Sequence, residues 1–172
     1  HAMKRLLLHE RPPIDYDELV IATGSASNKF GWPGQDLPGV QGLYDLFDLR
    51  MLNDNVRNCR RAVIVGGGLI GIELAEMLLV RGVAVTFLVR EKSYWGNILP
   101  PEESAMVGEL IRHHGIDLRL STELQEVHPG PDGRVGHITT KYGERIECQI
   151  VGLTAGVSPN KKVAETSGIP CG

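Results

Sequence analysis

The segment Gly66–Gly71 (GGGLIG) has the residue types and spacing to bind an anion. Gly66, Gly68 and Gly71 match G-x-G-x-x-G, in which the first glycine allows a tight turn, the second lets the backbone approach a phosphate, and the third lets a helix pack closely on a strand. A phosphate above this turn would meet free N–H groups at the positive end of a helix. The pattern therefore predicts binding of a dinucleotide through its diphosphate. The predicted contact residues are Gly66, Gly67, Gly68, Leu69, Ile70 and Gly71.

The flanking segments have the patterns needed to position this turn. Ala62–Val65 is a short apolar run, typical of a parallel strand that is buried on both faces. After the turn, Leu74 and Leu78 recur at helical spacing, so one helix face would pack on the sheet. Val83–Val89 (VAVTFLV) follows at the distance expected of a second parallel strand. Together these segments predict a βαβ unit.

The end of the second strand bears on which nucleotide is bound. In NAD-binding units, an Asp or Glu at this position hydrogen-bonds the ribose hydroxyls. Here the position holds Val89, followed by Arg90 and nearby Lys92, whose charges suit the 2′-phosphate of NADP. We therefore expect NADP or NAD to bind, with NADP favoured. Two alternatives stay open: Glu91 becomes the ribose acid if the strand ends two residues later, or the charged residues form a solvated loop.

The remaining patterns complete an α/β fold. We expect a Rossmann-like parallel sheet with helices on both faces and an antiparallel β-meander. Pro101 suits the start of a helix and Gly115 its C-terminal cap. We also expect a turn over Glu10–Ile14, an irregular connection over residues 26–42 and a helix over Leu43–Asn55. The expected strands are Lys4–His9, Tyr16–Ser25, Ala62–Val65, Val83–Val89, Ile116–Leu120, Glu123–His128, Val135–Thr140 and Ile150–Leu153.

Composition excludes several classes of function. A formal charge of -3, with scattered basic residues, argues against nucleic-acid binding. No apolar run approaches the ~20 residues of a transmembrane helix, so no membrane partner is expected. Cys59, Cys148 and Cys171 are odd in number and widely spaced, which favours a reducing compartment, by default the cytoplasm. His113 and His114 are adjacent and cannot share a helix face, so we expect no metal site there.

Three motifs together resemble the pyridine nucleotide-disulfide oxidoreductases, a family of flavoproteins that bind two dinucleotides. Tyr16–Ser25 (YDELVIATGS) is similar to the family's Y-D-x-L-v-i-A-T-G-s segment. Gly66–Glu73 (GGGLIGIE) resembles its G-G-G-x-I-G-x-E, and Ala155–Asn160 (AGVSPN) resembles its late G-x-x-P-N. The turn at 32–34 and the meander also match. An acidic residue usually opens the strand before the last motif, whereas Gln149 stands there in this chain.

The resemblance implies a fragment. The family's first G-x-G-x-x-G, which holds FAD, is absent, as are its C-terminal regions. We thus expect residues 1–42 to carry the last strands of an FAD domain and a connection, residues 43–160 an NAD(P)H-binding domain, and residues 161–172 the return to the FAD domain. The full-length protein would pass hydride from the nicotinamide to FAD and then to an acceptor that the sequence does not name. The expected partners of the fragment are the nicotinamide nucleotide and the remainder of its own chain, and a homodimer is an option for the full-length protein. FAD is not expected in the fragment.

Further single residues have candidate roles, and the resemblance implies the one for Glu73. Glu73 would lie near the nicotinamide and help to position it, or would only complement the helix dipole from the first turn. Ala155 and Gly156 end a strand where α/β sheets collect ligands, although a pure turn role is an alternative. Tyr94 and Trp95 would cover an adenine or cap the core.

Two other functions compete with the enzyme fragment. One is a non-catalytic nucleotide-binding or redox-sensing module of the same fold. The other is a dehydrogenase with its own substrate pocket, which is disfavoured because no Tyr-x-x-x-Lys or catalytic histidine arrangement follows the nucleotide motif.

Overall fold

The computed structural model describes residues 3–170, which divide into two compact units. Unit 1 comprises residues 3–24 and 159–170, and unit 2 comprises residues 25–158. Unit 2 contains the glycine-rich turn and the strands around it. Residues 25–42, which the sequence groups with the first segment, belong to unit 2.

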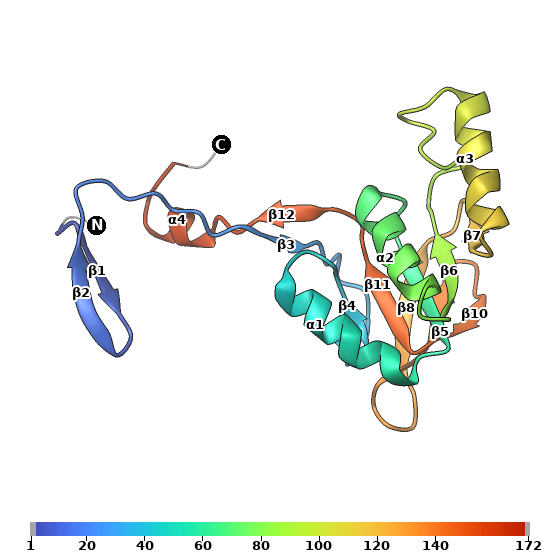
Figure 1. Ribbon diagram of the computed structural model, residues 1–172, viewed down its shortest axis with the longest axis horizontal. Coiled ribbons are helices and arrows are strands. Elements are labelled where there is room, and N and C mark those ends of the chain that lie inside the picture. The colour runs from blue at the N-terminus through green and yellow to red at the C-terminus, as the bar shows by residue number, and fades with distance from the viewer. Residues whose placement is uncertain (1–2, 171–172) are drawn as a thin grey trace. The chain divides into compact units, whose positions relative to one another are not determined.

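A five-stranded parallel sheet forms the centre of unit 2 (Figure 1). Its strands lie in the order β4 (Val40–Gln41), β11 (Ile150–Leu153), β5 (Arg61–Val65), β6 (Ala84–Leu88) and β7 (Asp117–Arg119). The four apolar residues of β5 are buried because neighbouring elements cover both faces of the sheet. In register, Val65 pairs with Leu88 of β6 on one side and with Leu153 of β11 on the other. The carboxyl ends of these three strands therefore meet at one edge.

Helices cover one face of this sheet. They are α1 (Leu46–Asn55), continued by the short 3-10 helix η1 (Val56–Asn58), α2 (Leu69–Leu79) and α3 (Pro101–His113). The Asp45 carboxylate caps α1 by accepting the N–H of Asp48 at 2.9 Å. Pro101 occupies the first position of α3, as the sequence predicts, and Gly115 follows the helix end with a left-handed φ of 81°.

The predicted meander covers the opposite face. It is a three-stranded antiparallel sheet of β8 (Leu124–Pro129), β9 (Val135–Thr140) and β10 (Arg145–Glu147), in the order β10-β9-β8. Residues that alternate along β5 divide between the two faces. Ile64 packs in the cluster under the helices, whereas Val63 and Val65 pack with Val127 and Ile138 of the meander.

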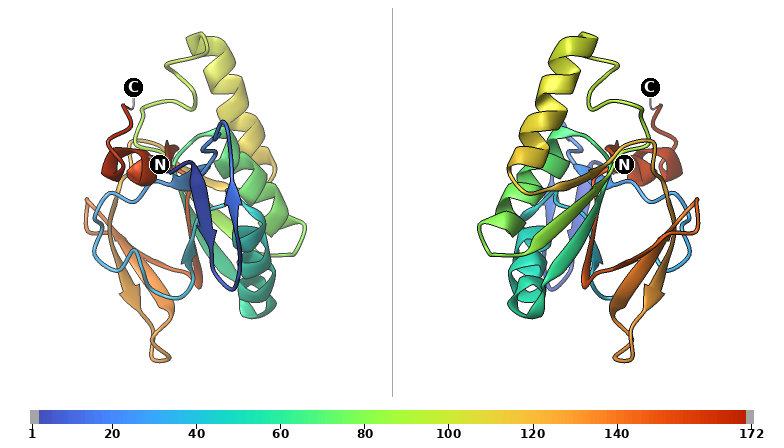
Figure 2. Two further views of the ribbon diagram at one scale, coloured as in Figure 1. Left: turned by 90° about the vertical axis from the view of Figure 1, so that its left-hand side faces the viewer. Right: turned by 90° about the vertical axis from the view of Figure 1, so that its right-hand side faces the viewer.

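The Rossmann-like α/β class is thus confirmed, but the two faces of the sheet differ from expectation. All three long helices pack on one face, and the meander occupies the face where further helices were expected, as Figure 2 shows. The physical reason is that any element with an apolar face can cover a sheet. The meander has such a face, because its Val127 and Ile138 are buried against the sheet.

Unit 1 holds a two-stranded antiparallel ribbon and a short helix. The ribbon pairs β1 (Arg5–Leu8) with β2 (Arg11–Asp15), and the helix is α4 (Lys162–Thr166). The predicted turn over Glu10–Ile14 is wrong, because the chain already turns at Glu10, where φ is 56°, and β2 follows at once. Proline is tolerated in β2 because a ribbon edge needs no N–H there.

The predicted strand over Tyr16–Ser25 is also wrong. Residues 16–24 form no strand, and the next strand is β3 (Ser25–Ser27), which pairs with β12 (Val157–Pro159). Val20, in the middle of the apolar run, is 88% exposed. A strand needs a neighbouring strand to pair with, and within residues 3–170 no strand pairs with residues 16–24.

Two of the family-like motifs nevertheless meet within unit 1. The Asn160 side chain donates to the carbonyl of Thr23 at 3.0 Å, and the Thr23 hydroxyl donates to the Asn160 carbonyl at 2.6 Å. The Asn160 N–H also donates to the carbonyl of Gly24 at 2.8 Å. These reciprocal bonds join segments that lie 137 residues apart in sequence.

Gln149, at the position before β11, has a structural role. Its side-chain oxygen accepts the backbone N–H groups of Arg60 at 3.0 Å and Arg61 at 3.1 Å. These bonds tie the start of β5 to the segment that enters β11. A neutral amide oxygen is sufficient for this role.

The described cysteines are free thiols. Burial raises the pKa of Cys59 to about 11 and that of Cys148 to about 12. Both side chains therefore stay protonated near neutral pH, which makes them poor nucleophiles. Cys171 lies outside the described residues.

Candidate functional site

The glycine-rich turn joins β5 to α2 through two glycines with distinct geometry. Gly66 has a φ of 113°, and a Cβ there would lie 2.8 Å from backbone atoms of Thr154 and Ala155. Only glycine fits such a position without strain. Gly68 is the N-cap of α2, in extended conformation, and no side chain caps this helix end. In the first turn, the N–H of Gly71 donates to the Gly68 carbonyl at 3.1 Å, whereas the N–H groups of Leu69 and Ile70 are left for another acceptor.

Gly71 lets α2 lie very close to the sheet. A Cβ at this position would come within 2.6 Å of the Gly66 carbonyl oxygen and 2.7 Å of the Phe87 ring. Gly68 contrasts with it, because a Cβ there would meet only the Thr154 carbonyl oxygen, at 3.9 Å. Gly66 and Gly71 therefore provide the tight turn and the close helix–sheet contact that the sequence predicts, and the surface at Gly68 is open.

A cleft of about 630 Å³ opens beside this turn, at the edge where β5, β6 and β11 end. Its volume lies in the range of about 300–1,000 Å³ that is usual for small-molecule sites. The residues that line it come from the glycine turn, the strand ends, the connection after β3 and the meander. They are Phe30, Trp32, Val65, Gly66, Gly67, Gly68, Leu88, Arg90, Glu91, Thr122, Glu123, Leu124, Lys141, Thr154, Ala155 and Gly156.

Thr154 is a site residue that the sequence analysis did not single out. Its buried hydroxyl lies 3.1 Å from the Val65 carbonyl oxygen and 3.0 Å from that of Gly66, and it donates to these acceptors. The side chain therefore joins the end of β11 to the glycine turn, 88 residues away. A polar residue directly after the apolar run Ile150–Leu153 was the available signal.

The cleft gathers about half of the residues predicted for the site. Gly66, Gly67 and Gly68 line it, together with Arg90, Ala155 and Gly156. Gly71 lies behind the turn, and Ile70 is half-buried in α2. Leu69 is 70% exposed and Lys92 is exposed, and neither belongs to the lining.

Val89 lies beneath the turn instead of facing the cleft. It is 2% exposed, and a Cβ on Gly67 would approach its methyl groups at 3.2 and 3.3 Å. Its N–H donates to the Arg119 carbonyl at 2.9 Å, and its carbonyl accepts from Thr122 at 3.0 Å. Of the residues that follow β6, Arg90 and Glu91 line the cleft and Val89 does not, so Glu91 is the first acidic residue after the strand that reaches the cleft.

Glu73 is exposed and lies outside the cleft lining. The expectation that it belongs to the first turn of the helix is wrong, because α2 begins at Leu69 and has no acid in its first turn. The helix dipole acts mainly within that first turn, so its effect on Glu73 is small.

The charges at the cleft occur as two ion pairs. Arg90 Nε lies 2.9 Å from Glu91 Oε1, and Lys141 Nζ lies 2.8 Å from Glu123 Oε2. The hydrogen bond to Glu91 is the main cause that raises the pKa of Arg90 above its usual value. Both pairs are at least partly exposed, so solvent weakens them and a ligand can compete for either partner.

Tyr94 and Trp95 pack with the core, which is the second of the two alternatives for them, and neither lines the cleft. Tyr94 is 1% exposed and packs against Phe87, with ring centroids 5.9 Å apart. Burial raises the pKa of its hydroxyl, which has no hydrogen-bond partner among residues 3–170. Trp95 instead donates from its indole nitrogen to the Gly67 carbonyl at 2.6 Å. These two aromatic side chains therefore contact the glycine-rich turn and do not line the cleft.

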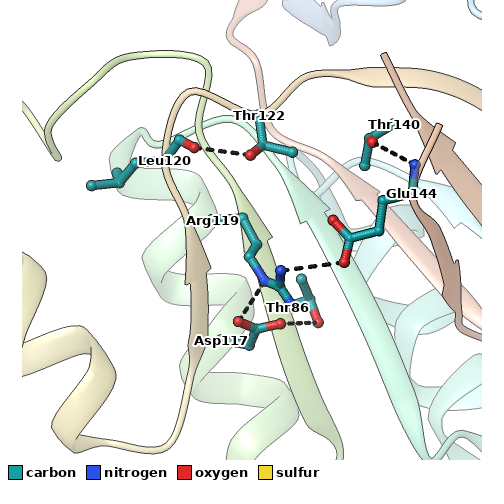
Figure 3. Close-up of polar contacts among 7 residues, drawn as sticks. All are labelled: Thr86, Asp117, Arg119, Leu120, Thr122, Thr140 and Glu144. Carbon is teal, nitrogen blue, oxygen red and sulfur yellow. Dashed lines mark hydrogen bonds and ion pairs between the residues drawn. The ribbon is translucent and has the colours of Figure 1, made fainter. Parts of the chain in front are cut away.

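Arg119 links β7 to the turn between β9 and β10 of the meander (Figure 3). Its guanidinium bonds Asp117 through Nε at 2.7 Å and Glu144 through Nη1 at 3.2 Å. The Thr140 hydroxyl accepts the N–H of Glu144 at 3.2 Å, which closes the turn between β9 and β10. These contacts hold the turn that carries Lys141 against β7.

No group of three or more histidine, cysteine or acidic side chains within residues 3–170 is arranged to hold a metal ion. The rings of His113 and His114 are perpendicular, with centroids 6.1 Å apart. In the same range, none of the helices has the length and apolar character needed to cross a membrane.

The parallel sheet, the glycine-rich turn and the cleft at the carboxyl ends of the strands define a Rossmann-like α/β protein. The family profile described as pyridine nucleotide-disulphide oxidoreductase matches residues 3–172. The chain therefore belongs to the pyridine nucleotide-disulphide oxidoreductase family.

Individual relatives agree with this family. Rhodocoxin reductase of Rhodococcus erythropolis is 30% identical over 167 residues, which cover 97% of this chain and 39% of that protein. A ferredoxin reductase from Rhodopseudomonas palustris has a TM-score of 0.87 at 26% identity, over 99% of this chain and 42% of the other. An FAD-dependent pyridine nucleotide-disulphide oxidoreductase from Desulfovibrio vulgaris has a TM-score of 0.86 at 27% identity, over 99% and 45%.

The chain thus spans about 40% of the length of the relatives that it matches. Two of these relatives are named reductases and the third an FAD-dependent oxidoreductase, and each match extends over nearly the whole of this chain.

Proposed function

We propose that residues 25–158 bind a nicotinamide dinucleotide in the cleft, with its diphosphate above the glycine-rich turn. The observation that carries this proposal is the uncapped N-terminus of α2 at Gly68, beside a cleft of suitable size. A diphosphate there would accept hydrogen bonds from free N–H groups and lie at the positive end of the helix. The open space above Gly68 lets a phosphate approach the backbone.

In the longer protein, we infer that this unit holds NADH or NADPH so that hydride passes to FAD. The two cofactors supply the redox chemistry, and the protein binds and orients them. Ala155 and Gly156 border the cleft at the end of β11, where the nicotinamide end of the ligand would lie if the adenosine end lies at β6. On this proposal Glu73 has a positioning role, and residues of unit 1 belong to the FAD domain of the longer chain.

We expect the purified 172-residue protein to bind NADH or NADPH and to contain no flavin. Its one G-x-G-x-x-G is the turn after β5, which leaves no second diphosphate loop for FAD. Calorimetric titration with both nucleotides measures binding, and the absorption spectrum measures flavin. Titrations that release no heat at millimolar nucleotide would contradict the binding site, and a stoichiometric flavin band would contradict the second expectation.

The preference for NADP over NAD is a separate prediction that concerns Arg90 and Glu91. Arg90→Ala should weaken NADPH binding about tenfold, because a charge-assisted bond to the 2′-phosphate is lost, and should leave NADH binding within about twofold. Glu91→Gln should act in the opposite direction on NADPH, because Glu91 now competes for the guanidinium. Lys92→Ala should have a smaller effect, since Lys92 lies outside the cleft lining.

Titration of these three variants with both nucleotides checks the assignment. If wild-type protein binds NADH more tightly than NADPH, the preference is wrong. If Glu91→Gln weakens NADH binding selectively, Glu91 is the ribose acid and the alternative interpretation of the strand end is correct.

A further inference from the structure

The loop after β6 contacts the glycine-rich turn through one short hydrogen bond. Trp95 Nε1 donates to the carbonyl oxygen of Gly67 at 2.6 Å. The indole ring lies against Tyr94, with centroids 5.3 Å apart and planes 35° apart. A Cβ on Gly67 would lie 3.4 Å from the edge of the Tyr94 ring. The two aromatic side chains therefore support the turn at Gly67.

This hydrogen bond fixes the direction of a backbone N–H. The carbonyl of Gly67 and the N–H of Gly68 belong to one planar trans peptide unit, so they point in opposite directions. With the carbonyl held by Trp95, the N–H of Gly68 points away from the loop. No acceptor for this N–H is found in the part of the chain that the structure describes, and Gly68 lines the cleft.

A peptide unit between two glycines needs such an anchor. Because neither residue has a Cβ, rotation of the unit to the opposite orientation meets little steric resistance. A rotated unit would present a carbonyl oxygen to the cleft, where it would repel a phosphate. The indole N–H stabilises the other orientation.

Trp95 is itself held firmly. Its φ of 55° is rarely adopted by a bulky residue. Its carbonyl accepts the N–H groups of both Ile98 and Leu99 at 2.8 Å, which keeps this conformation. The hydroxyl of Ser104, a buried residue of α3, donates to the Tyr94 carbonyl at 2.5 Å. The loop is thus tied to α3 on one side and to the glycine-rich turn on the other.

We propose that Trp95 is a positioning residue for the diphosphate of the bound nucleotide, acting through the peptide unit between Gly67 and Gly68. This inference rests on the proposed nucleotide site. The hydrogen bond from the indole N–H orients the Gly68 N–H toward a phosphate oxygen. Loss of this bond should therefore weaken the binding of ligands that carry a diphosphate.

The test compares wild type with Trp95→Phe, which keeps an aromatic ring but lacks the indole donor. We expect the dissociation constants of ADP and NADH to rise about five- to tenfold, the effect of losing about one hydrogen bond. Binding of adenosine, which has no phosphate, should change by less than twofold. A purely structural role would weaken all three ligands in proportion, so the ratio of ADP to adenosine affinity is the decisive readout.

A second measurement uses the native protein, in case Trp95→Phe does not fold. The chain has two tryptophans, so an amide correlation spectrum contains two indole signals, and Trp32→Phe identifies the one from Trp95. We expect the Trp95 indole proton to exchange with solvent at least about tenfold more slowly than that of Trp32, because it is hydrogen-bonded. Equal exchange rates would overturn the inference.

The outcomes separate the two proposals. If wild type binds neither ADP nor NADH, the proposed function fails and this inference fails with it. If wild type binds both and Trp95→Phe binds them with unchanged affinity, the proposed function stands and only the role of Trp95 is overturned. Selective loss of ADP and NADH binding, with a protected indole proton, supports the inference.

Discussion

Gly68→Ala is expected to weaken NADH and NADPH binding at least about tenfold, or about 1.4 kcal/mol. The added methyl group would occupy the open surface where the diphosphate contacts the backbone. The fold should survive, because the nearest atom to the new Cβ is the Thr154 carbonyl oxygen at 3.9 Å. Alanine is a poorer N-cap than glycine but has less freedom to lose on folding, and the two effects roughly cancel.

Calorimetry and thermal unfolding of the same preparation check this result. The melting temperature should stay within about 3 °C of wild type. Gly108→Ala in α3 is the matched control, because Gly108 lies outside the cleft lining. This variant should bind NADH and NADPH with wild-type affinity. A folded Gly68→Ala variant with wild-type nucleotide affinity would show that the diphosphate does not lie above this turn.

Gly71→Ala should instead damage the fold. The new methyl group would lie 2.6 Å from the Gly66 carbonyl oxygen, 2.7 Å from Phe87 and 2.9 Å from the Thr154 hydroxyl. Two of these atoms belong to the turn and the buried ring, which cannot move without shifting α2 from the sheet. Such overpacking should lower the free energy of unfolding by about 3 kcal/mol and the melting temperature by roughly 10 °C.

Gly108→Ala is again the control, with the opposite expected sign. Gly108 lies inside α3, and a Cβ there would make ordinary contacts, at 3.5 Å to Arg112 and 3.8 Å to Leu118. Alanine stabilises a helix interior by about 0.5–1 kcal/mol relative to glycine. If urea unfolding gives Gly71→Ala the same stability as Gly108→Ala, α2 does not approach the sheet as closely as the structure has it.

Elements whose signal is local were predicted well. The strand Ile150–Leu153 and the strand Val135–Thr140 have the predicted bounds, and α3 begins at the predicted Pro101. The strand, turn and helix around Gly66–Gly71 also follow the prediction. Each of these features depends on residues that are adjacent in sequence, where apolar periodicity, a proline or a glycine acts directly on the backbone.

Elements that depend on a distant partner were predicted poorly. The apolar run at Leu19–Ile21 resembles a buried strand but finds no neighbour to pair with in the described chain. The second face of the sheet is covered by the meander, although nothing in the local pattern says which face an amphipathic element will cover. The periodicity of apolar residues indicates that one face of a helix or strand is buried, but it does not identify the element that covers this face.

The sequence by itself determined the family, the α/β class and the position of the glycine-rich turn, because a G-x-G-x-x-G between strand and helix acts through local backbone geometry. Only the tertiary structure decided which residues reach the cleft. It buries Val89 under the turn, brings Thr154 to Gly66, and places the Trp95 indole on the Gly67 carbonyl. These contacts join segments 28 and 88 residues apart, and such pairings arise from the packing of β6, β11 and the loops that follow them. Short-range sequence patterns therefore cannot predict these contacts.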